Sequence, residues 1–182
     1  SGHAPVLLDV DGDGCDEILI GYNLVDNDGT LLWSVPVENA TQEHADNINP
    51  VDLDGDGEIE IAYSGSKDFF VANIKGEVLW RQPHEHSQNT TAGRFRDDVD
   101  GLSLILNEKW IGMTCYTPDG QVLWQKPGVG YARQVVRGWR SDGLDLVIYG
   151  PALKKQHEEV PYNSVPEETQ QYWPFLMDGD GN

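Results

Sequence analysis

Short stretches in which apolar and polar residues alternate recur along this chain, and most are closed by turns that contain glycine. They are clearest in the second quarter of the chain, where we expect strands at residues 48–53, 58–63, 69–74 and 78–81. Within 58–63, Ile59 and Ile61 alternate with Glu58 and Glu60, which is the period of a strand. No stretch of comparable strength has the period of a helix. The pattern predicts an all-β chain.

The strands belong to a repeat. A turn followed by Leu-Trp occurs three times, and 47 residues separate Trp33 from Trp80, while 44 separate Trp80 from Trp124. An acidic loop occurs twice, as DVDGDGCDE at residues 9–17 and DLDGDGEIE at 52–60, and the two loops begin 43 residues apart. Repeats of this length that hold several short strands are typical of β-propeller blades. We expect blades at residues 1–36, 37–83, 84–127 and 128–175, with the start of a fifth at 176–182.

About four blades do not easily close a ring, because an open row leaves strand edges and a flank uncovered. We therefore expect this chain to be part of a larger ring, completed by the remainder of a longer protein or by a second copy. Residues 151–174 are polar, contain four prolines and break the repeat. They are predicted to form a long excursion from the fourth blade.

Composition narrows the classes of partner. The chain has 182 residues, with 31 Asp and Glu against 12 Lys and Arg, and its formal net charge is −19 at pH 7. That balance excludes nucleic acid and an anionic membrane surface as partners, since both require clustered basic side chains. The 38% hydrophobic content and the 20 glycines indicate a folded, turn-rich chain rather than a disordered one.

The two acidic loops predict Ca²⁺ sites. Each has carboxylates at loop positions 1, 3, 5 and 9, a glycine at 6 and a residue at 7 that offers its backbone carbonyl. Hard oxygen ligands in this number suit Ca²⁺, and without an ion the carboxylates repel one another. An acidic turn without metal is the alternative, which the repetition at the blade period disfavours. The expected ligands are Asp9, Asp11, Asp13, Cys15 and Glu17 in the first loop, and Asp52, Asp54, Asp56, Glu58 and Glu60 in the second.

The third and fourth repeats carry arginine where the first two have aspartate. Arg94, Arg96 and Arg137 fall in these loops, close to further aspartates. One interpretation is structural: a guanidinium paired with a carboxylate holds the turn in place of a metal ion. The other is functional: some of these arginines face the channel and bind an anionic substrate. The sequence favours the first interpretation and leaves both open.

Histidines recur just before the first strand of each repeat, which is innermost in a propeller blade. His3 precedes the first acidic loop, His44 the second and His86 the third, while Arg133 takes this place in the fourth repeat. These side chains are therefore expected to face a common axis at one end of the channel. Imidazole accepts and donates protons near neutral pH, so the cluster is a candidate for acid–base chemistry.

Three segments carry a resemblance to a known family: VDGDGCDEI at 10–18, GYNLVDNDG at 21–29, and His44-Ala-Asp46 ahead of the second acidic loop. Together they resemble the propeller of bacterial rhamnogalacturonan lyases, over roughly residues 2–150. The acidic loop alone also resembles those of FG-GAP and VCBS propellers. The resemblance implies an eight-bladed ring, Ca²⁺ in the loops and cleavage of an acidic polysaccharide by β-elimination.

Under this resemblance, the leading function is a secreted or periplasmic polysaccharide lyase. Arg133 or Ca²⁺ would neutralise the uronate carboxylate. His44, together with His3 or His86, would serve as base and acid, and Tyr131 is a further candidate. The alternative is a non-catalytic, Ca²⁺-stabilised propeller that binds a glycan or a protein.

Overall fold

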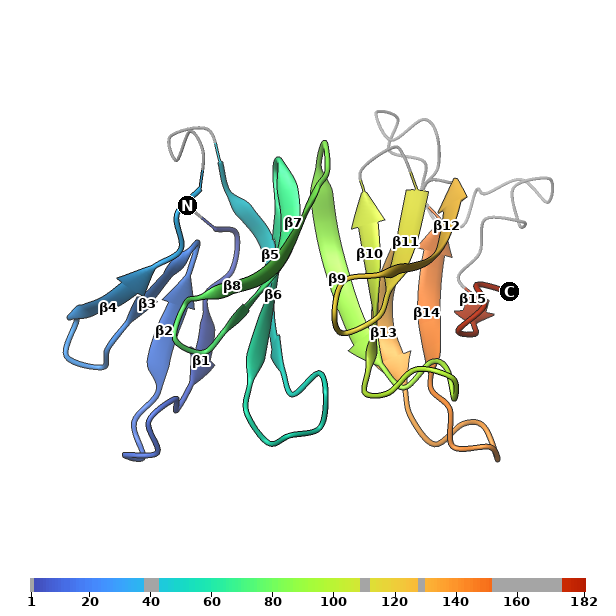
Figure 1. The fold of residues 1–182 in the computed structure, drawn as a ribbon, viewed down its shortest axis with the longest axis horizontal. Helices are drawn as coiled ribbons and strands as arrows, with labels where there is room; N and C mark the ends of the chain where they lie inside the picture. Colours follow the sequence, from blue (N-terminus) through green and yellow to red (C-terminus); the bar gives the residue numbers. More distant parts are fainter. Residues whose placement is uncertain (1, 38–42, 109–111, 128–129, 152–174) are drawn as a thin grey trace, which may run out of the picture.

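The computed structural model describes residues 2–37, 43–108, 112–127, 130–151 and 175–182. These residues are all-β, with no helix among them, and form four antiparallel sheets that follow one another like propeller blades (Figure 1). This confirms the fold class expected from the sequence. No helix long and apolar enough to span a membrane occurs in the described residues. The expected excursion at 151–174 lies outside the described residues, apart from Pro151 at the end of a strand.

Each sheet is a meander in which consecutive strands pair. Blade 1 consists of β1 (Val6–Leu8), β2 (Glu17–Ile20), β3 (Asn23–Val25) and β4 (Leu31–Ser34). Blade 2 consists of β5 (Ala45–Val51), β6 (Glu60–Gly65), β7 (Asp68–Asn73) and β8 (Val78–Pro83). Blade 3 consists of β9 (Ser87–Gly93), β10 (Ser103–Glu108), β11 (Gly112–Tyr116) and β12 (Val122–Pro127). Blade 4 consists of β13 (Gly130–Val136), β14 (Leu146–Pro151) and β15 (Phe175–Met177).

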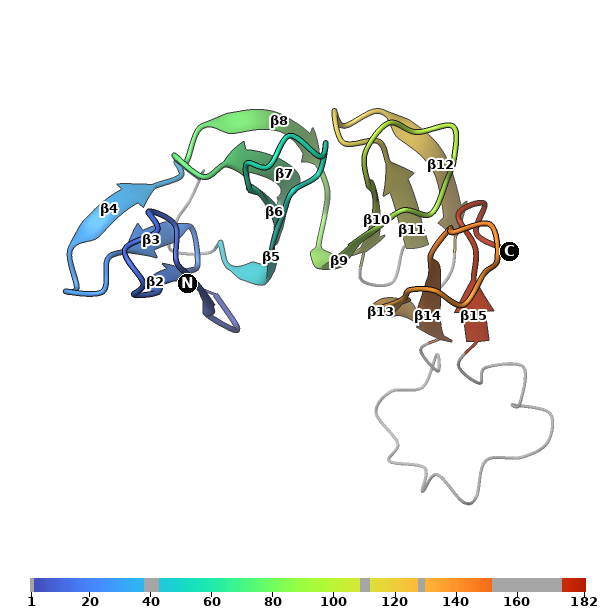
Figure 2. The same ribbon diagram turned by 90° about the horizontal axis from the view of Figure 1, so that it is seen from below.

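The first strands of the blades form an inner wall. In Figure 2, β5, β9 and β13 lie along the concave side of the row, and β4, β8 and β12 lie along the convex side. The three inner strands run in the same direction, so their beginnings share one end of the wall and the loops that follow them share the other. The histidines, which precede the inner strands, and the acidic loops, which follow them, therefore lie at opposite ends of the wall.

The core lies between blades. Three clusters of buried side chains fill the three contacts between neighbouring sheets. Tyr63 and Phe70 of blade 2 stack on one another and face Leu19 of blade 1, whereas Phe69 on the other face of blade 2 packs against Leu104 of blade 3. The alternation of strand side chains thus gives blade 2 two buried faces, one for each neighbour.

The repeated tryptophans fasten each blade to the next. The indole N–H of each outer-strand tryptophan donates a hydrogen bond to a carbonyl in the outer turn of the following blade: Trp33 to Ile74 (3.0 Å), Trp80 to Pro118 (2.7 Å) and Trp124 to Gly179 (2.7 Å). The bond satisfies a polar group that would otherwise be costly at a packed contact. The Leu-Trp repeat therefore encodes the contact between blades as well as a strand.

The end of the sequence departs from the expectation of a fifth blade beginning at 176. Phe175–Met177 pairs with β14 and is the third strand of blade 4. Residues 178–182 form its outer turn, with the same two backbone hydrogen bonds found at 26–30, 73–77 and 117–121. The sequence Asp-Gly-Asp-Gly is shared with the acidic loops, but here Asp178 N–H donates to Asn182 and Gly181 N–H to Asp178. The motif marks a tight turn in both places.

Two equivalent glycines, one in the outer turn of blade 1 and one in that of blade 3, offer a matched test of the tryptophan contact. Gly29 and Gly120 occupy the same position, with φ of 89° and 85°. A Cβ added at Gly120 would lie 2.6 Å from the Trp80 ring, whereas one at Gly29 meets nothing within 4 Å. We expect Gly29→Ala to cost about 1–2 kcal/mol, from the left-handed backbone alone, and Gly120→Ala about 2–5 kcal/mol, because it also displaces Trp80. Urea unfolding measures both, and equal costs would contradict the role of Trp80.

Buried groups of blade 3 are expected to make the fold sensitive to alkali. Burial raises the pKa of the Cys115 thiol from 9.0 to about 12, and that of the Tyr116 hydroxyl from 10.0 to about 12. The unfolded chain releases these protons at lower pH than the folded chain does. The free energy of unfolding should therefore fall as pH rises above about 9. In Cys115→Ala the fall should begin nearer pH 10, as followed by urea unfolding at a series of pH values. An unchanged profile in that variant would contradict the assignment.

Candidate functional site

Three histidines from three blades converge on one buried carboxylate. His3 precedes β1, His44 directly precedes β5 and His86 directly precedes β9. Asp46 of β5, whose side chain is only 5% exposed, lies 3.3 Å from His3 Nδ1, 3.2 Å from His44 Nε2 and 3.7 Å from His86 Nε2. The rings of His3 and His44 stack with centroids 4.9 Å apart, and His86 meets His44 edge-on at 5.8 Å. We call these four residues the His–Asp centre.

Local backbone geometry builds this centre. The N-terminal segment crosses onto blade 2, where His3 N–H donates a hydrogen bond to the Ala45 carbonyl at 3.1 Å. The pairing of β5 with β6 shifts register between Ala45 and Asn47, so that Asp46 is the extra residue of a β-bulge. Bulges turn a side chain out of the regular alternation and are frequent at functional sites. The bulge lets one carboxylate meet imidazoles of three blades.

The imidazoles differ in the contacts of their ring nitrogens and in their exposure to solvent. His44 Nδ1 lies 2.7 Å from the Ser66 hydroxyl, with which it shares a hydrogen bond, and its Nε2 approaches Asp46 Oδ2 at 3.2 Å. His3 faces Asp46 through Nδ1 and is 64% exposed, whereas the side chain of His44 is 27% exposed. The imidazole of His3 is thus the more accessible of the two to a ligand. Ligand atoms of His3, His44 and Asp46 lie within 4.8 Å of one another, an arrangement that also suits a transition metal such as Zn²⁺.

The remaining sequence candidates for catalysis lie in blade 4. Tyr131 and Arg133 are residues of β13, and the pairing of β13 with β14 shifts register between Ala132 and Gln134, at Arg133. The side chains of Tyr131 and Arg133 lie outside the described part of the structure. Asp46 and Ser66 were missed as site residues. A signal for Asp46 was present, since His44-Ala-Asp46 in an extended strand places two polar side chains on one face.

The two acidic loops lie at the other end of the inner wall, and each contains the same pattern of hydrogen bonds. Asp9 accepts from the N–H groups of Gly12 and Gly14 at 2.8 and 3.1 Å, and Asp52 accepts from the equivalent Gly55 and Gly57 at 2.7 and 3.1 Å. The carboxylate at loop position 9 turns inward in both loops. Glu17 accepts from Val10 N–H at 2.7 Å, and Glu60 accepts from Leu53 N–H at 2.9 Å.

Carboxylate oxygens gather in each loop. One oxygen each from Asp9, Asp11 and Asp13 lie within 4.8 Å of one another, as do oxygens of Asp52, Asp54 and Glu60. The other oxygen of Glu17 is buried and accepts no hydrogen bond from any described residue. Burial raises the pKa of Glu60, against the opposing effect of the Leu53 N–H. A buried carboxylate oxygen without a donor is costly, and a cation would relieve that cost. Cys15, Asp56 and Glu58 also lie in these loops, where Asp13 and Asp56 accept from the N–H groups of Cys15 and Glu58.

The arginines of the third and fourth loops divide into two groups. Arg96 is held by Asp98 at 2.6 Å and by Asp180 of the blade 4 turn, as the structural interpretation expects. Arg94 and Arg137 are exposed, and neither guanidinium pairs with a carboxylate among the described residues. They directly follow β9 and β13, in the place that Asp52 takes after β5. In the described residues these two arginines thus differ from Arg96, which two carboxylates hold.

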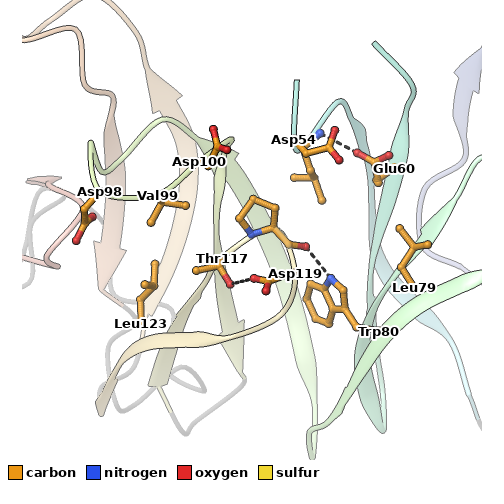
Figure 3. A pocket seen from close by; sticks show the side chains of 12 residues that line it. Asp54, Glu60, Leu79, Trp80, Asp98, Val99, Asp100, Thr117, Asp119 and Leu123 are labelled. Carbon is orange, nitrogen blue, oxygen red and sulfur yellow. Dashed lines mark hydrogen bonds between the residues drawn. The ribbon is translucent and has the colours of Figure 1, made fainter. Parts of the chain in front are cut away.

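A groove of about 600 Å³ opens between blades 2 and 3 on their outer side (Figure 3). Its wall includes Trp80, whose indole N–H is committed to Pro118, and the hydrogen-bonded pair Thr117 and Asp119. Asp54, Glu60, Asp98 and Asp100 complete an acidic lining, in which the described part of the chain places no lysine or arginine. Such a groove repels an anionic ligand.

Comparison with family models and with curated proteins gives no match for this sequence. Among solved structures, the chain is similar to the rhamnogalacturonan lyase YesW, with a TM-score of 0.60 and 20% identity over 86% of this chain and 28% of that one. It is similar to the rhamnogalacturonan lyase PL11 of Bacillus licheniformis, with a TM-score of 0.56 and 16% identity over 83% and 34%. It is also similar to the biofilm matrix protein Bap1 of V. cholerae, with a TM-score of 0.62 and 21% identity over 98% and 27%. The chain thus spans about a quarter to a third of the length of these proteins, and the likeness is one of fold.

Proposed function

We propose that this chain belongs to a secreted or periplasmic, carbohydrate-active propeller that cleaves an acidic, rhamnogalacturonan-like glycan by β-elimination. The observation that carries the proposal is the His–Asp centre, in which three blades direct imidazoles at one buried carboxylate. The fold shared with two rhamnogalacturonan lyases supports it.

The reaction needs a base beside the C5 proton of a uronate. In the proposed roles, Asp46 holds the Nδ1 side of His3, which leaves Nε2 of His3 to take that proton. The C5–H electron pair then forms the C4–C5 double bond as the C4–O4 bond breaks. His86 is the proposed donor of the proton that the leaving O4 takes up. Orientation of an imidazole by a carboxylate is a recurring device for this kind of proton transfer.

Two Ca²⁺ ions in the acidic loops form the second part of the proposal. The first would be held by Asp9, Asp11, Asp13, Glu17 and the carbonyl of Cys15, and the second by Asp52, Asp54, Asp56, Glu60 and the carbonyl of Glu58. When bound, the ion would neutralise the carboxylates and fix the turn between the first two strands of a blade. The buried Glu17 oxygen without a donor supports the first site.

Incubation with rhamnogalacturonan and with a second uronate polysaccharide tests the activity directly. Elimination creates a double bond conjugated to the carboxylate, so an active protein raises the ultraviolet absorbance of the solution. A non-catalytic propeller that binds a glycan or a protein is the second candidate, favoured by the likeness to a biofilm matrix protein. Retention of the polysaccharide without any rise in absorbance would identify that second function.

A further inference from the structure

We propose that the inner wall holds a second, distal binding site for the acidic glycan, centred on Arg137 and separate from the His–Asp centre. A groove of about 630 Å³ runs over the inner strands β5, β9 and β13. The side chains that give it polarity are amides, hydroxyls and one guanidinium: Asn47, Asn49, Asn89, Thr90, Thr91, Gln134 and Arg137. This inference rests on the proposed function for the identity of its ligand.

The charge of this groove differs from that of the rest of the protein. The chain has a formal net charge of −19, and the outer groove beside Trp80 is lined by acids. A groove that includes Asp52, Asp97, Asp98 and Asp100 beside Arg94 is also predominantly acidic. Among the described residues, the lining of the groove on the inner wall contains no carboxylate, and Arg137 gives it a positive charge. An anionic sugar is therefore repelled by these other two grooves and attracted here.

Two amides of this groove are already oriented. Asn47 accepts a hydrogen bond from Thr90 N–H at 3.1 Å, and Asn49 donates through Nδ2 to the Thr90 carbonyl at 3.4 Å. Both bonds join β5 to β9, so they fix the side chains across the contact between blades 2 and 3. These two bonds leave the N–H₂ of the Asn47 amide and the oxygen of the Asn49 amide unused. A donor and an acceptor on alternate residues of one strand suit the hydroxyls of a sugar, which both give and accept hydrogen bonds.

The wall is too long for one sugar to reach both sites. His44 directly precedes β5, and Arg137 directly follows β13, so the two lie at opposite ends of parallel inner strands. Seven residues of β5 rise about 23 Å at about 3.3 Å per residue. Arg137 therefore binds the carboxylate of a uronate several sugars away from the one at the His–Asp centre. The polymer, rather than a single sugar, is the ligand that uses the whole wall.

The test is calorimetric titration of the protein with a saturated acidic oligosaccharide of alternating uronate and deoxyhexose residues, beside a neutral oligosaccharide of equal length. We expect Arg137→Gln to weaken binding of the acidic oligosaccharide about 10- to 100-fold, the loss of a charge-assisted hydrogen bond, and to leave binding of the neutral one unchanged. Arg140→Gln is the matched control. It changes the net charge equally, but Arg140 is paired with Asp142 and does not line the groove.

Several outcomes overturn the inference: no binding of the acidic oligosaccharide to the wild-type protein, equal affinity in Arg137→Gln, or an equal loss in Arg140→Gln. The proposed function fails separately. Binding that depends on Arg137, with no ultraviolet-absorbing product from any uronate polysaccharide, removes the lyase activity and keeps this site. If the protein catalyses elimination but Arg137→Gln leaves its KM unchanged, the proposed lyase activity stands and the proposed distal site is wrong.

Discussion

Replacing Asp46 with asparagine is expected to slow β-elimination about 10²- to 10⁴-fold, which is the usual contribution of a carboxylate that orients a catalytic imidazole. The amide has nearly the same shape, so packing at this 5%-exposed position should be kept while the charge that holds His3 is lost. The initial rate of ultraviolet absorbance on an acidic polysaccharide measures the effect. Asp28→Asn is the control, since Asp28 lies in the exposed outer turn of blade 1.

The exposure of His3 allows a second measurement that a purely structural role would not affect. His3→Ala should lose as much activity as Asp46→Asn, and added imidazole should restore part of it, because the 64%-exposed ring leaves an open space beside Asp46. Asp46→Asn should not respond to imidazole. Full activity in Asp46→Asn, or rescue in both variants, would contradict the proposed roles.

Removal of Ca²⁺ is expected to have the largest effect on stability. A ligand present at 100 times its Kd stabilises the folded state by about 2.7 kcal/mol per site, so two sites give about 5 kcal/mol. For a chain of this length that corresponds to a fall in Tm of about 10–20 °C on chelation. Thermal unfolding with Ca²⁺ and with excess chelator measures the shift.

Substitutions at loop position 1 distinguish the effect of bound Ca²⁺ on Tm from a general effect of salt. Asp9→Asn and Asp52→Asn should each remove about half of the response to chelator, and the double variant should not respond. Asp100→Asn in the third loop should respond as the wild-type protein does, because arginine takes position 1 there. A Tm that is the same with and without Ca²⁺ in the wild-type protein would contradict both sites.

Much of the fold could be predicted because it depends on sequence patterns of short period, namely the alternation of apolar and polar residues and the spacing of the repeats. Alternation gave the strands of blade 2 to within a few residues, and the spacing of Trp33, Trp80 and Trp124 gave the blade repeat. The end of blade 4 could not be predicted in the same way. Asp-Gly-Asp-Gly favours a tight turn wherever it occurs, and only the pairing of β15 with β14 shows which turn it makes.

Part of the candidate site could also be predicted, because its histidines recur at the same position of the repeat. Recurrence before each inner strand indicated that His3, His44 and His86 share one end of the wall. The spacing His44-Ala-Asp46 places a carboxylate near the histidines, but the contact of Asp46 with all three depends on a β-bulge, which is a property of the pairing of β5 with β6. Asparagine is depleted in β-strands, so the sequence does not mark the asparagines of the inner wall as strand residues. The groove that they line can be recognised only from the contact between β5 and β9.

The tryptophan hydrogen bonds join each blade only to the one that follows it. A row of units held by nearest-neighbour contacts behaves as a one-dimensional array, whose members can be lost one at a time from an end. Among the described residues, blade 1 packs against blade 2 alone, and Leu7 and Ile20 on its sheet are exposed. Cooperativity among the described blades therefore depends on these contacts between neighbours, and a blade that lacks a partner on one side is held by fewer of them.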